Sequence, residues 1–540
     1  MSAGEFRVGR LRMSRPAAGA AAATVAFIAL SAWWLAVDKR TPGGGDPADH
    51  LTTALRIGDL LRAGDLGGIF DVGFDPDTDR FYPPLVQLIG GIAPALHLEP
   101  IQDWGELAVN LVFAPMLAAG TYLVGRRVYG PTAGLLAAIF ALGTPMVLSL
   151  FHVFLLDAPL AATVAIALAA LLASERFTAR RASVIAGALV GLAMLVKTIA
   201  PLYLAGPVLV MLVAGGWRQW RNLALAAAAF LIVAGPYYLA HLNEVVDVGE
   251  ASTVGGEIGA TGTAFDRDAR ISFDNLTWYA WAAINDQYFV PLLALFAVGF
   301  VAAFREMRRR AGVPELLAGI VITYLALPVV LSLRDPRYTL PLVAFVAVIA
   351  TGWITTTART AFRRIGLAVL GIAVAANVAV SITGKIPVVR PETPGTNFEF
   401  GIDPGSFTIL DDTGYWVGPP ETNPLWRDLF EAADRDGLDT LRLYTRQQPL
   451  FWGVDYKGLD VFGVPYGVRE VTVNAPRPWP AAELHVTIWT DDAEYVGRRG
   501  FPEPCGHIDE GAGLLTGEPV TTSVLVERQT AGGYERWCDF

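Results

Sequence analysis

Ionisable residues interrupt the long apolar segments of this sequence at only a few points. The segments that carry them are "GGGDPADHL" with Asp46 and Asp49, "FHVFLLDAPL" with Asp157, "AMLVKTIAPLYL" with Lys197, and "SLRDPRYTLPLV" with Arg334 and Arg337. A carboxylate can take a proton from an attacking hydroxyl, and lysine or arginine can hold a departing phosphate. If these segments meet, their residue types indicate transfer of a group away from a phosphate.

Each of these residues also has a simpler interpretation. Asp46 and Asp157 could cap helices. Lys197 could extend to the lipid headgroups or pair with a carboxylate, and Arg334 and Arg337 could bind anionic headgroups. Only the elements that position them can decide between the two interpretations.

The composition places these residues in a membrane protein. Of 540 residues, 53% are hydrophobic and 17% charged, and apolar runs of about 17–25 residues are the length that a membrane-spanning helix needs. We predict eleven spans, at roughly 17–37, 105–124, 131–151, 158–174, 183–197, 200–214, 221–240, 287–304, 314–333, 339–357 and 365–383.

The arginines between the spans predict their orientation. Five short connections are rich in arginine: "GRRVYG", "SERFTARR", "GGWRQWR", "FREMRRR" and "TARTAFRR". Short loops with excess Lys and Arg stay cytoplasmic. All five connections lie in the cytoplasm, together with the N-terminal segment 1–16, only if the apolar stretch "FYPPLVQLIGGIAPALHL" (81–98) does not cross the membrane. The prolines and glycines of this stretch also argue against a spanning helix.

This topology places three larger segments outside the cytoplasm: the first outer loop 38–104, the loop 241–286 and the tail 384–540. In the first loop, "HLTTALRIGDLLRAGDL" (50–66) predicts an amphipathic helix at the membrane surface. The stretch 81–98 is expected to pack against the bundle there. All the ionisable residues named above then lie on the outer face.

The tail is expected to be a small soluble α/β domain. Strand-like alternation occurs at 440–446, 468–474, 483–490 and 522–529, and a helix is predicted over 424–437. From Lys385 to Phe540 there are 25 Asp and Glu against 13 Lys and Arg, which argues against a nucleic-acid partner. Cys505 and Cys538 could form a disulfide outside the cytoplasm, or could be two unrelated thiols.

In their order along the chain, these motifs resemble a known family. An acid after the first span, "YPPL", "LLDAPLAATVAIALAALLASERF", "LVKTIAPLYL" and "DPRYTLPLVAFVAVIA" together resemble the membrane glycosyltransferases of the GT-C fold, of the protein O-mannosyltransferase and lipid A aminoarabinose transferase type. The resemblance covers residues 17–383. It implies an α-helical polytopic membrane protein that moves a sugar from a polyprenyl-phosphate donor to an acceptor on the outer face.

The resemblance also implies roles for individual residues. Asp46 would be the general base and Asp157 would orient a substrate. Lys197, Arg334, Arg337 and Tyr338 would bind the donor phosphate, with His50, His152 and Tyr82 as accessory residues. The family places Glu and Tyr where this chain has Pro47 and His50, so Asp49 remains an alternative for the base.

The resemblance further implies the partners. The acceptor would be an envelope glycan, a lipid or a protein, and the chain would lie in the cell membrane among its lipids. No cofactor is expected with certainty, and the spacing of the acids and histidines defines no ligand set for a divalent cation. A flippase for a lipid-linked sugar would need ionisable groups near mid-membrane and related halves, and a non-catalytic envelope scaffold would not need acids and cations on one face.

Overall fold

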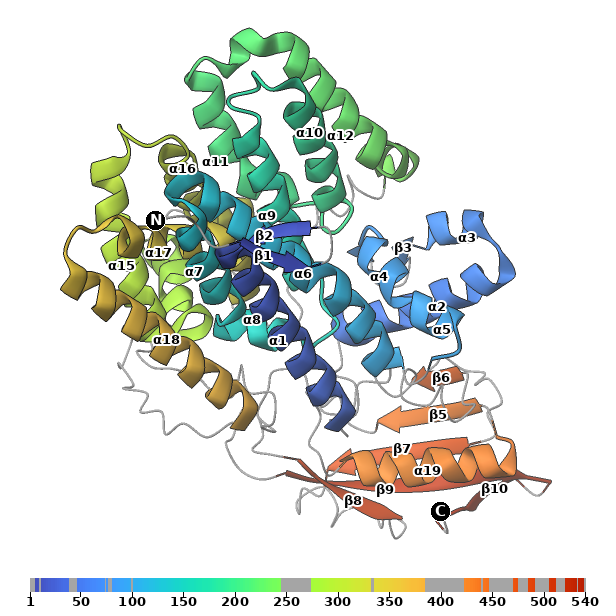
Figure 1. Cartoon of the computed structure of the whole chain (residues 1–540). Coiled ribbons are helices and arrows are strands. Elements are labelled where there is room, and N and C mark those ends of the chain that lie inside the picture. The colour runs from blue at the N-terminus through green and yellow to red at the C-terminus, as the bar shows by residue number, and fades with distance from the viewer. Residues whose placement is uncertain are drawn as a thin grey trace.

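The apolar part of the chain is a helical bundle, and the tail carries a β-sheet (Figure 1). This computed structural model describes residues 5–8, 11–37, 46–72, 74–75, 80–98, 101–243, 273–331, 335–383, 422–438, 440–445, 470–473, 484–490, 505–510, 520–531 and 533–538. The N-terminal segment begins with a hairpin of β1 (Glu5–Val8) and β2 (Leu11–Ser14).

The bundle contains a helix at each of the eleven predicted spans. Its helices are α1 (Arg15–Val37), α6 (Ile101–Tyr129), α7 (Pro131–Leu142), α8 (Pro145–Leu150), α9 (Asp157–Ala173), α10 (Arg180–Met194), α11 (Ala200–Val213), η1 (Gly216–Gln219), α12 (Trp220–Ala240), α14 (Phe273–Ala282), η3 (Ala283–Gln287), α15 (Phe289–Glu306), α16 (Val313–Val330), η4 (Pro336–Leu342), α17 (Val343–Thr356) and α18 (Thr360–Thr383). Among the described residues, seven helices are long and apolar enough to cross a membrane.

Four of the predicted spans contain shorter helices. The segment 131–151 is broken after α7, because Gly143 ends that helix and Pro145 starts α8. Helices α9, α10 and α11 have 17, 15 and 14 residues. Since α10 ends at Met194, Lys197 lies in the turn between α10 and α11 rather than inside a helix.

Two helices form the centre of the bundle. In α9, Ala161, Ala162 and Leu168 have no exposed surface, and α17 is similarly enclosed. The small side chains of α9 let its neighbours approach closely: the backbone of Ala165 and Ile166 packs directly on Gly120 of α6. The first part of α9, which begins with Asp157, is therefore held closely by packing: residues 157–165 are all buried.

The first outer loop folds into short elements, shown in blue in Figure 1. They are α2 (Asp46–Ala63), α3 (Leu66–Asp71), β3 (Phe74–Asp75), β4 (Arg80–Phe81), α4 (Leu85–Gly90) and α5 (Ile92–Ala95). Helix α2 starts at Asp46, four residues earlier than the predicted start. Helices α4 and α5 have six and four residues, far short of the roughly 20 that a span needs.

The stretch 81–98 packs closely on α2. Pro94 lies against Gly58, and Gly91 lies against the Ala54 carbonyl, so a side chain at either glycine would clash. Val86 is fully buried in the main core. The prolines and glycines that weaken this stretch as a spanning helix are the residues that let it bend and fit against the loop helix.

The described tail is an α/β unit. Its elements are α19 (Thr422–Asp436), β5 (Thr440–Thr445), β6 (Glu470–Val473), β7 (Leu484–Thr490), β8 (Gly506–Glu510), β9 (Val520–Thr530) and β10 (Gly533–Arg536). The sheet order is β10-β9-β7-β5-β6, with β8 also paired to β9. Strand β5 is parallel to β6 and β7, and β9 runs antiparallel to β7. All four predicted strands and the predicted helix are present.

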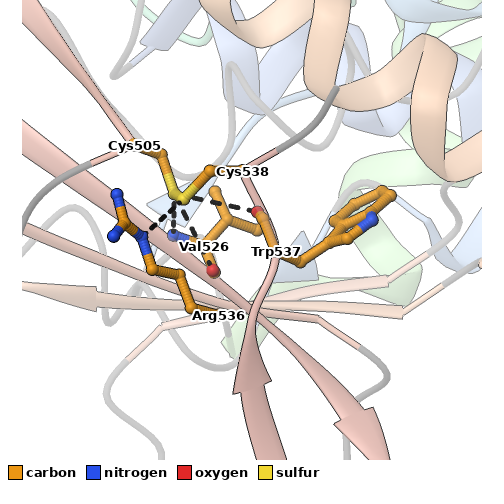
Figure 2. Close-up of a disulfide and its surroundings, with 5 residues drawn as sticks. All are labelled: Cys505, Val526, Arg536, Trp537 and Cys538. Atoms are coloured by element: carbon orange, nitrogen blue, oxygen red, sulfur yellow. Dashed lines mark hydrogen bonds between the residues drawn. A yellow bond between two sulfur atoms is a disulfide. The ribbon is translucent and has the colours of Figure 1, made fainter.

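A disulfide between Cys505 and Cys538 closes the outer edge of this sheet (Figure 2). Strand β8 pairs with the first half of β9 and β10 with its last residues, so the two cysteines meet beside the middle of β9. There the Val526 N–H donates to Cys505 Sγ at 3.2 Å, and the Val526 carbonyl accepts from Trp537 N–H at 2.8 Å. The bridge joins two short strands that do not pair with each other.

Removing this bridge should destabilise the tail. The two cysteines are 33 residues apart, and closing a loop of that length lowers the entropy of the unfolded chain, worth about 3 to 4 kcal/mol. We expect Cys505→Ser with Cys538→Ser to lower the free energy of unfolding of the tail by about that amount, measured by pulse proteolysis of the full chain in urea. In the unmodified protein, denatured without reductant, a maleimide should label no cysteine; labelling of both would contradict the bridge.

Candidate active site

A buried ion pair lies at the start of α9. Lys197 Nζ donates to Asp157 Oδ1 at 2.9 Å, and the side chains of Lys197 and Asp157 are 16% and 3% exposed. Burial disfavours the charged ammonium, but the adjacent carboxylate outweighs this, and the pKa of Lys197 is raised. Lysine therefore stays protonated in this largely apolar setting.

Asp157 is not the helix cap that its position suggested. It is the first residue of α9, the cap position belongs to Leu156, and no side-chain cap hydrogen bond is present at this helix start. The carboxylate is instead directed to Lys197. The helix N-terminus still favours a negative charge at this point, because the helix dipole is positive there.

The segment before α17 lies directly against this pair. The Lys197 ammonium is 5.0 Å from the centre of the Tyr338 ring, and the Tyr203 hydroxyl donates to the Tyr338 carbonyl at 2.8 Å. Arg337 lies within electrostatic range of Lys197. Lys197 and the adjacent residues Arg337 and Tyr338, predicted from two separate motifs, are thus brought together.

Asp335 holds Arg337 in place. Its carboxylate accepts from the Arg337 backbone N–H at 2.8 Å and from Nε at 2.7 Å, and a second guanidinium nitrogen lies 2.5 Å away. Both side chains are less than a fifth exposed. Arg337 was predicted as a phosphate ligand; here its guanidinium is oriented by its own neighbour. Arg334 lies outside the described residues.

The first outer loop brings its polar residues to the same place. Tyr82 lies within electrostatic range of Lys197, and its ring contacts the His50 ring edge to face at 4.9 Å. His50 Nδ1 lies 3.1 Å from Gln87 Nε2, and both side chains are buried. The Tyr82 carbonyl accepts from the Tyr237 hydroxyl at 3.3 Å, which ties the loop to α12.

Asp46 and Asp49 lie in the first turn of α2. Position 46 is four residues before His50, one helical turn away and on the same side of the helix, whereas position 49 is rotated by about 100° from position 50. The side chains of both acids lie outside the described part of the structure.

His152 occupies the turn before α9. Its Nδ1 donates to the Leu148 carbonyl, and burial lowers the pKa of His152 to about 4. Its imidazole is therefore neutral near pH 7. Among the side chains that the structure describes, no group of three His, Cys, Asp or Glu is arranged as a metal site.

The sequence did not indicate one further residue of this region. Gln287 ends the π-helical segment η3, and its Nε2 donates to the Pro336 carbonyl at 3.1 Å and to Thr339 Oγ1 at 2.5 Å. Gln287 thereby holds both sides of the Arg337–Tyr338 turn. The residue after the adjacent Tyr288, Phe289, has a positive φ of 56°, so the backbone here is strained.

Comparison with known proteins supports the predicted fold class. Residues 82–238 match the family model described as dolichyl-phosphate-mannose-protein mannosyltransferase. The structure resembles ArnT from Cupriavidus metallidurans bound to undecaprenyl phosphate, with a TM-score of 0.58 and 16% identity over 92% of this chain and 97% of ArnT. Apo ArnT gives a TM-score of 0.58 and 16% identity over 94% and 98%. No curated protein matches the sequence.

The fold and these matches define a class of protein. The chain is a multi-pass membrane protein with the GT-C fold, and the resemblance predicted from its motifs is confirmed. The family model covers the stretch that contains Tyr82, Asp157 and Lys197. A match over 92% of the chain also extends beyond residue 383, so the likeness to ArnT includes part of the tail, which the motifs did not cover.

Separating the Asp157–Lys197 pair should be costly. Asp157→Asn keeps the shape but leaves a buried ammonium without its carboxylate, which costs about 3 to 5 kcal/mol. Adding Lys197→Met should restore part of that loss. We expect both results in the free energy of unfolding of the detergent-purified protein.

Glu306→Gln is the matched control: it breaks the more exposed Glu306–Arg310 pair and should cost under about 1 kcal/mol. Equal losses in the two single variants would contradict the account.

Gln287 should control the mobility of η4. Gln287→Met keeps the size of the side chain but removes both hydrogen bonds, so amide hydrogens of residues 336–342 should exchange faster with deuterium. Thr323→Val is the control, because the buried Thr323 hydroxyl has no hydrogen-bond partner among the described residues and its loss should leave η4 unchanged. Unchanged exchange in the Gln287 variant would show that η4 does not depend on it.

Proposed function

We propose that the protein is a glycosyltransferase that moves a sugar from a polyprenyl-phosphate donor to an acceptor hydroxyl outside the cytoplasm. The observation that carries this proposal is the meeting of Lys197, Arg337 and Tyr338 with the first-loop residues Tyr82 and His50. The structural likeness to ArnT, which was solved with undecaprenyl phosphate, supports the lipid carrier.

Lys197 and Arg337 are assigned to the donor phosphate. When the bond between the anomeric carbon and the phosphate oxygen breaks, the electron pair stays on that oxygen, and the polyprenyl phosphate gains negative charge. Fixed cations in a site of low dielectric stabilise such a charge more than water-exposed ones do. In this scheme the phosphate competes with Asp157 for Lys197 and with Asp335 for Arg337.

Asp157 is proposed to position Lys197 rather than to react. Its carboxylate is buried and hydrogen-bonded to the ammonium in the resting site. An acid held this way keeps the lysine charged and fixes its direction, both of which phosphate binding requires. In this proposal Asp157 orients the donor indirectly, by holding the Lys197 ammonium that binds the phosphate.

Asp46 is proposed as the general base, in preference to Asp49. The helical spacing places position 46 on the side of α2 that carries His50, whose ring contacts Tyr82 beside Lys197. The base takes the proton of the acceptor hydroxyl while its oxygen attacks the anomeric carbon. Around the helix axis, position 46 is rotated by about 40° from position 50, whereas position 49 is rotated by about 100°.

An outward-facing site fits the remaining features. Arginine-rich connections lie at the opposite end of the bundle, as the inside bias requires. A disulfide in the tail is typical of an oxidising compartment. We therefore propose that the N-terminus is cytoplasmic, that the tail lies outside, and that the acceptor is an envelope glycan, lipid or protein.

The proposal is tested by turnover of purified protein. Undecaprenyl-phosphate pentoses and hexoses are supplied with an envelope extract as acceptor, with and without a chelator, and the sugar transferred is measured. We expect Asp46→Asn to lower kcat by about 10² to 10⁴-fold, with Asp49→Asn as the matched control near the parent value. Lys197→Met should raise the donor KM by about 10-fold or more.

Two outcomes would overturn it. Full activity in both Asp46→Asn and Lys197→Met would remove the assigned site. Movement of the donor across proteoliposomes without any sugar transfer would instead identify a flippase.

A further inference from the structure

An open groove runs along the bundle surface between α6, α9 and α10. Its walls include Leu123 of α6, Ile166 and Ala170 of α9, and Ile185 and Leu189 of α10, and its volume is about 560 Å³. Leu123 and Ile185 are 41% and 53% exposed. Three of the four α9 residues that line it are alanines: Ala169, Ala170 and Ala173.

Two arginines close one end of this groove. Arg126 and Arg127, in the last turn of α6, line it together with the apolar residues. Arg127 is bound to Glu175 at 2.9 Å, whereas Arg126 is exposed and has no ion-pair partner among the residues that the structure describes. An apolar groove with excess positive charge at one end complements a molecule with an apolar chain and an anionic head.

Neighbouring residues mark this end as the level of the lipid headgroups. Trp217 of η1 and Trp220, the first residue of α12, are 61% and 65% exposed. Each lies under the arginine that follows it, Arg218 or Arg221. Exposed tryptophan and arginine gather at the membrane–water interface. Basic pockets between helices at that level bind anionic lipid headgroups.

We propose that this groove binds an anionic phospholipid, with an acyl chain between α6, α9 and α10 and its phosphate on Arg126 and Arg127. A zwitterionic lipid brings its own cation to two adjacent arginines, so it fits less well. The groove is separate from the candidate active site: Asp157 and Ala173 are the two ends of the 17-residue α9, about 24 Å apart.

The test compares lipids on the full-length, detergent-purified protein by native mass spectrometry. We expect phosphatidylglycerol to bind more tightly than phosphatidylcholine. Arg126→Gln should weaken phosphatidylglycerol binding by roughly fivefold, the contribution of one arginine near an anionic lipid. Ala170→Phe should fill the groove and weaken binding while both arginines remain. Arg364→Gln, at an exposed arginine of α18 that does not line this groove, is the matched control and should bind as the parent does.

Several results would overturn the proposal. They are equal affinity for the two lipids, an unchanged affinity in Arg126→Gln, or a loss in Arg364→Gln as large as in Arg126→Gln. Displacement of phosphatidylglycerol by undecaprenyl phosphate would assign the groove to the donor carrier instead. None of these readouts depends on sugar transfer, so the proposal stands or fails apart from the proposed activity.

Discussion

The candidate site depends on one buried ion pair between Lys197 and Asp157. Neither charge is tolerable alone in an apolar bundle, because water cannot solvate it there. Each therefore requires the other, and together they connect the start of α9 to the turn between α10 and α11. The carboxylate gains further from the positive end of the helix that it begins. The chain thus holds the Lys197 ammonium at a defined point and keeps it protonated.

Hydrogen bonds between distant segments build the rest of the site around that point. Tyr203 of α11 holds the Tyr338 carbonyl, Gln287 of η3 holds the other side of the same turn, and Tyr237 of α12 holds Tyr82. Each bond joins an outer loop or turn to a packed helix. The bundle is the rigid part, and the polar residues are positioned because their backbones are attached to it. At the opposite end of α9, Arg126 and Arg127 line the apolar groove between α6, α9 and α10.

Much of this arrangement follows from local patterns in the sequence. The apolar runs predicted a helix at every span, the alternating segments predicted four strands, and a helix was predicted where α19 lies. Each of these segments has a clear hydrophobic pattern of its own, which is why the sequence was enough. Asp157 and Lys197 stood out because charge is rare beside apolar runs, whereas Tyr338 was implied only by the family resemblance. Their spatial neighbourhood followed from the topology.

Other features depend on tertiary contacts that no local pattern reveals. Gln287 is an uncharged residue at the start of a predicted span, and nothing in the sequence marks it; only its bonds to Pro336 and Thr339 do. The pairing of Arg337 with Asp335 depends on the side-chain rotamer of Arg337, which the sequence does not reveal. The same residues would be present whether Arg337 bound a phosphate or its neighbour Asp335. Helix α7 stops at Gly143 although apolar residues continue to residue 151, because backbone geometry rather than hydropathy ends it. The bridge of Cys505 to Cys538 required strands β8 and β10 to share one edge of β9.

The most direct measurement is a structure of this protein with undecaprenyl phosphate bound. We expect a phosphate oxygen within hydrogen-bond distance of Lys197 Nζ, with Arg337 turned from Asp335 toward the same phosphate and α2 beside it. A phosphate bound elsewhere, with Lys197 still held only by Asp157, would contradict this expectation.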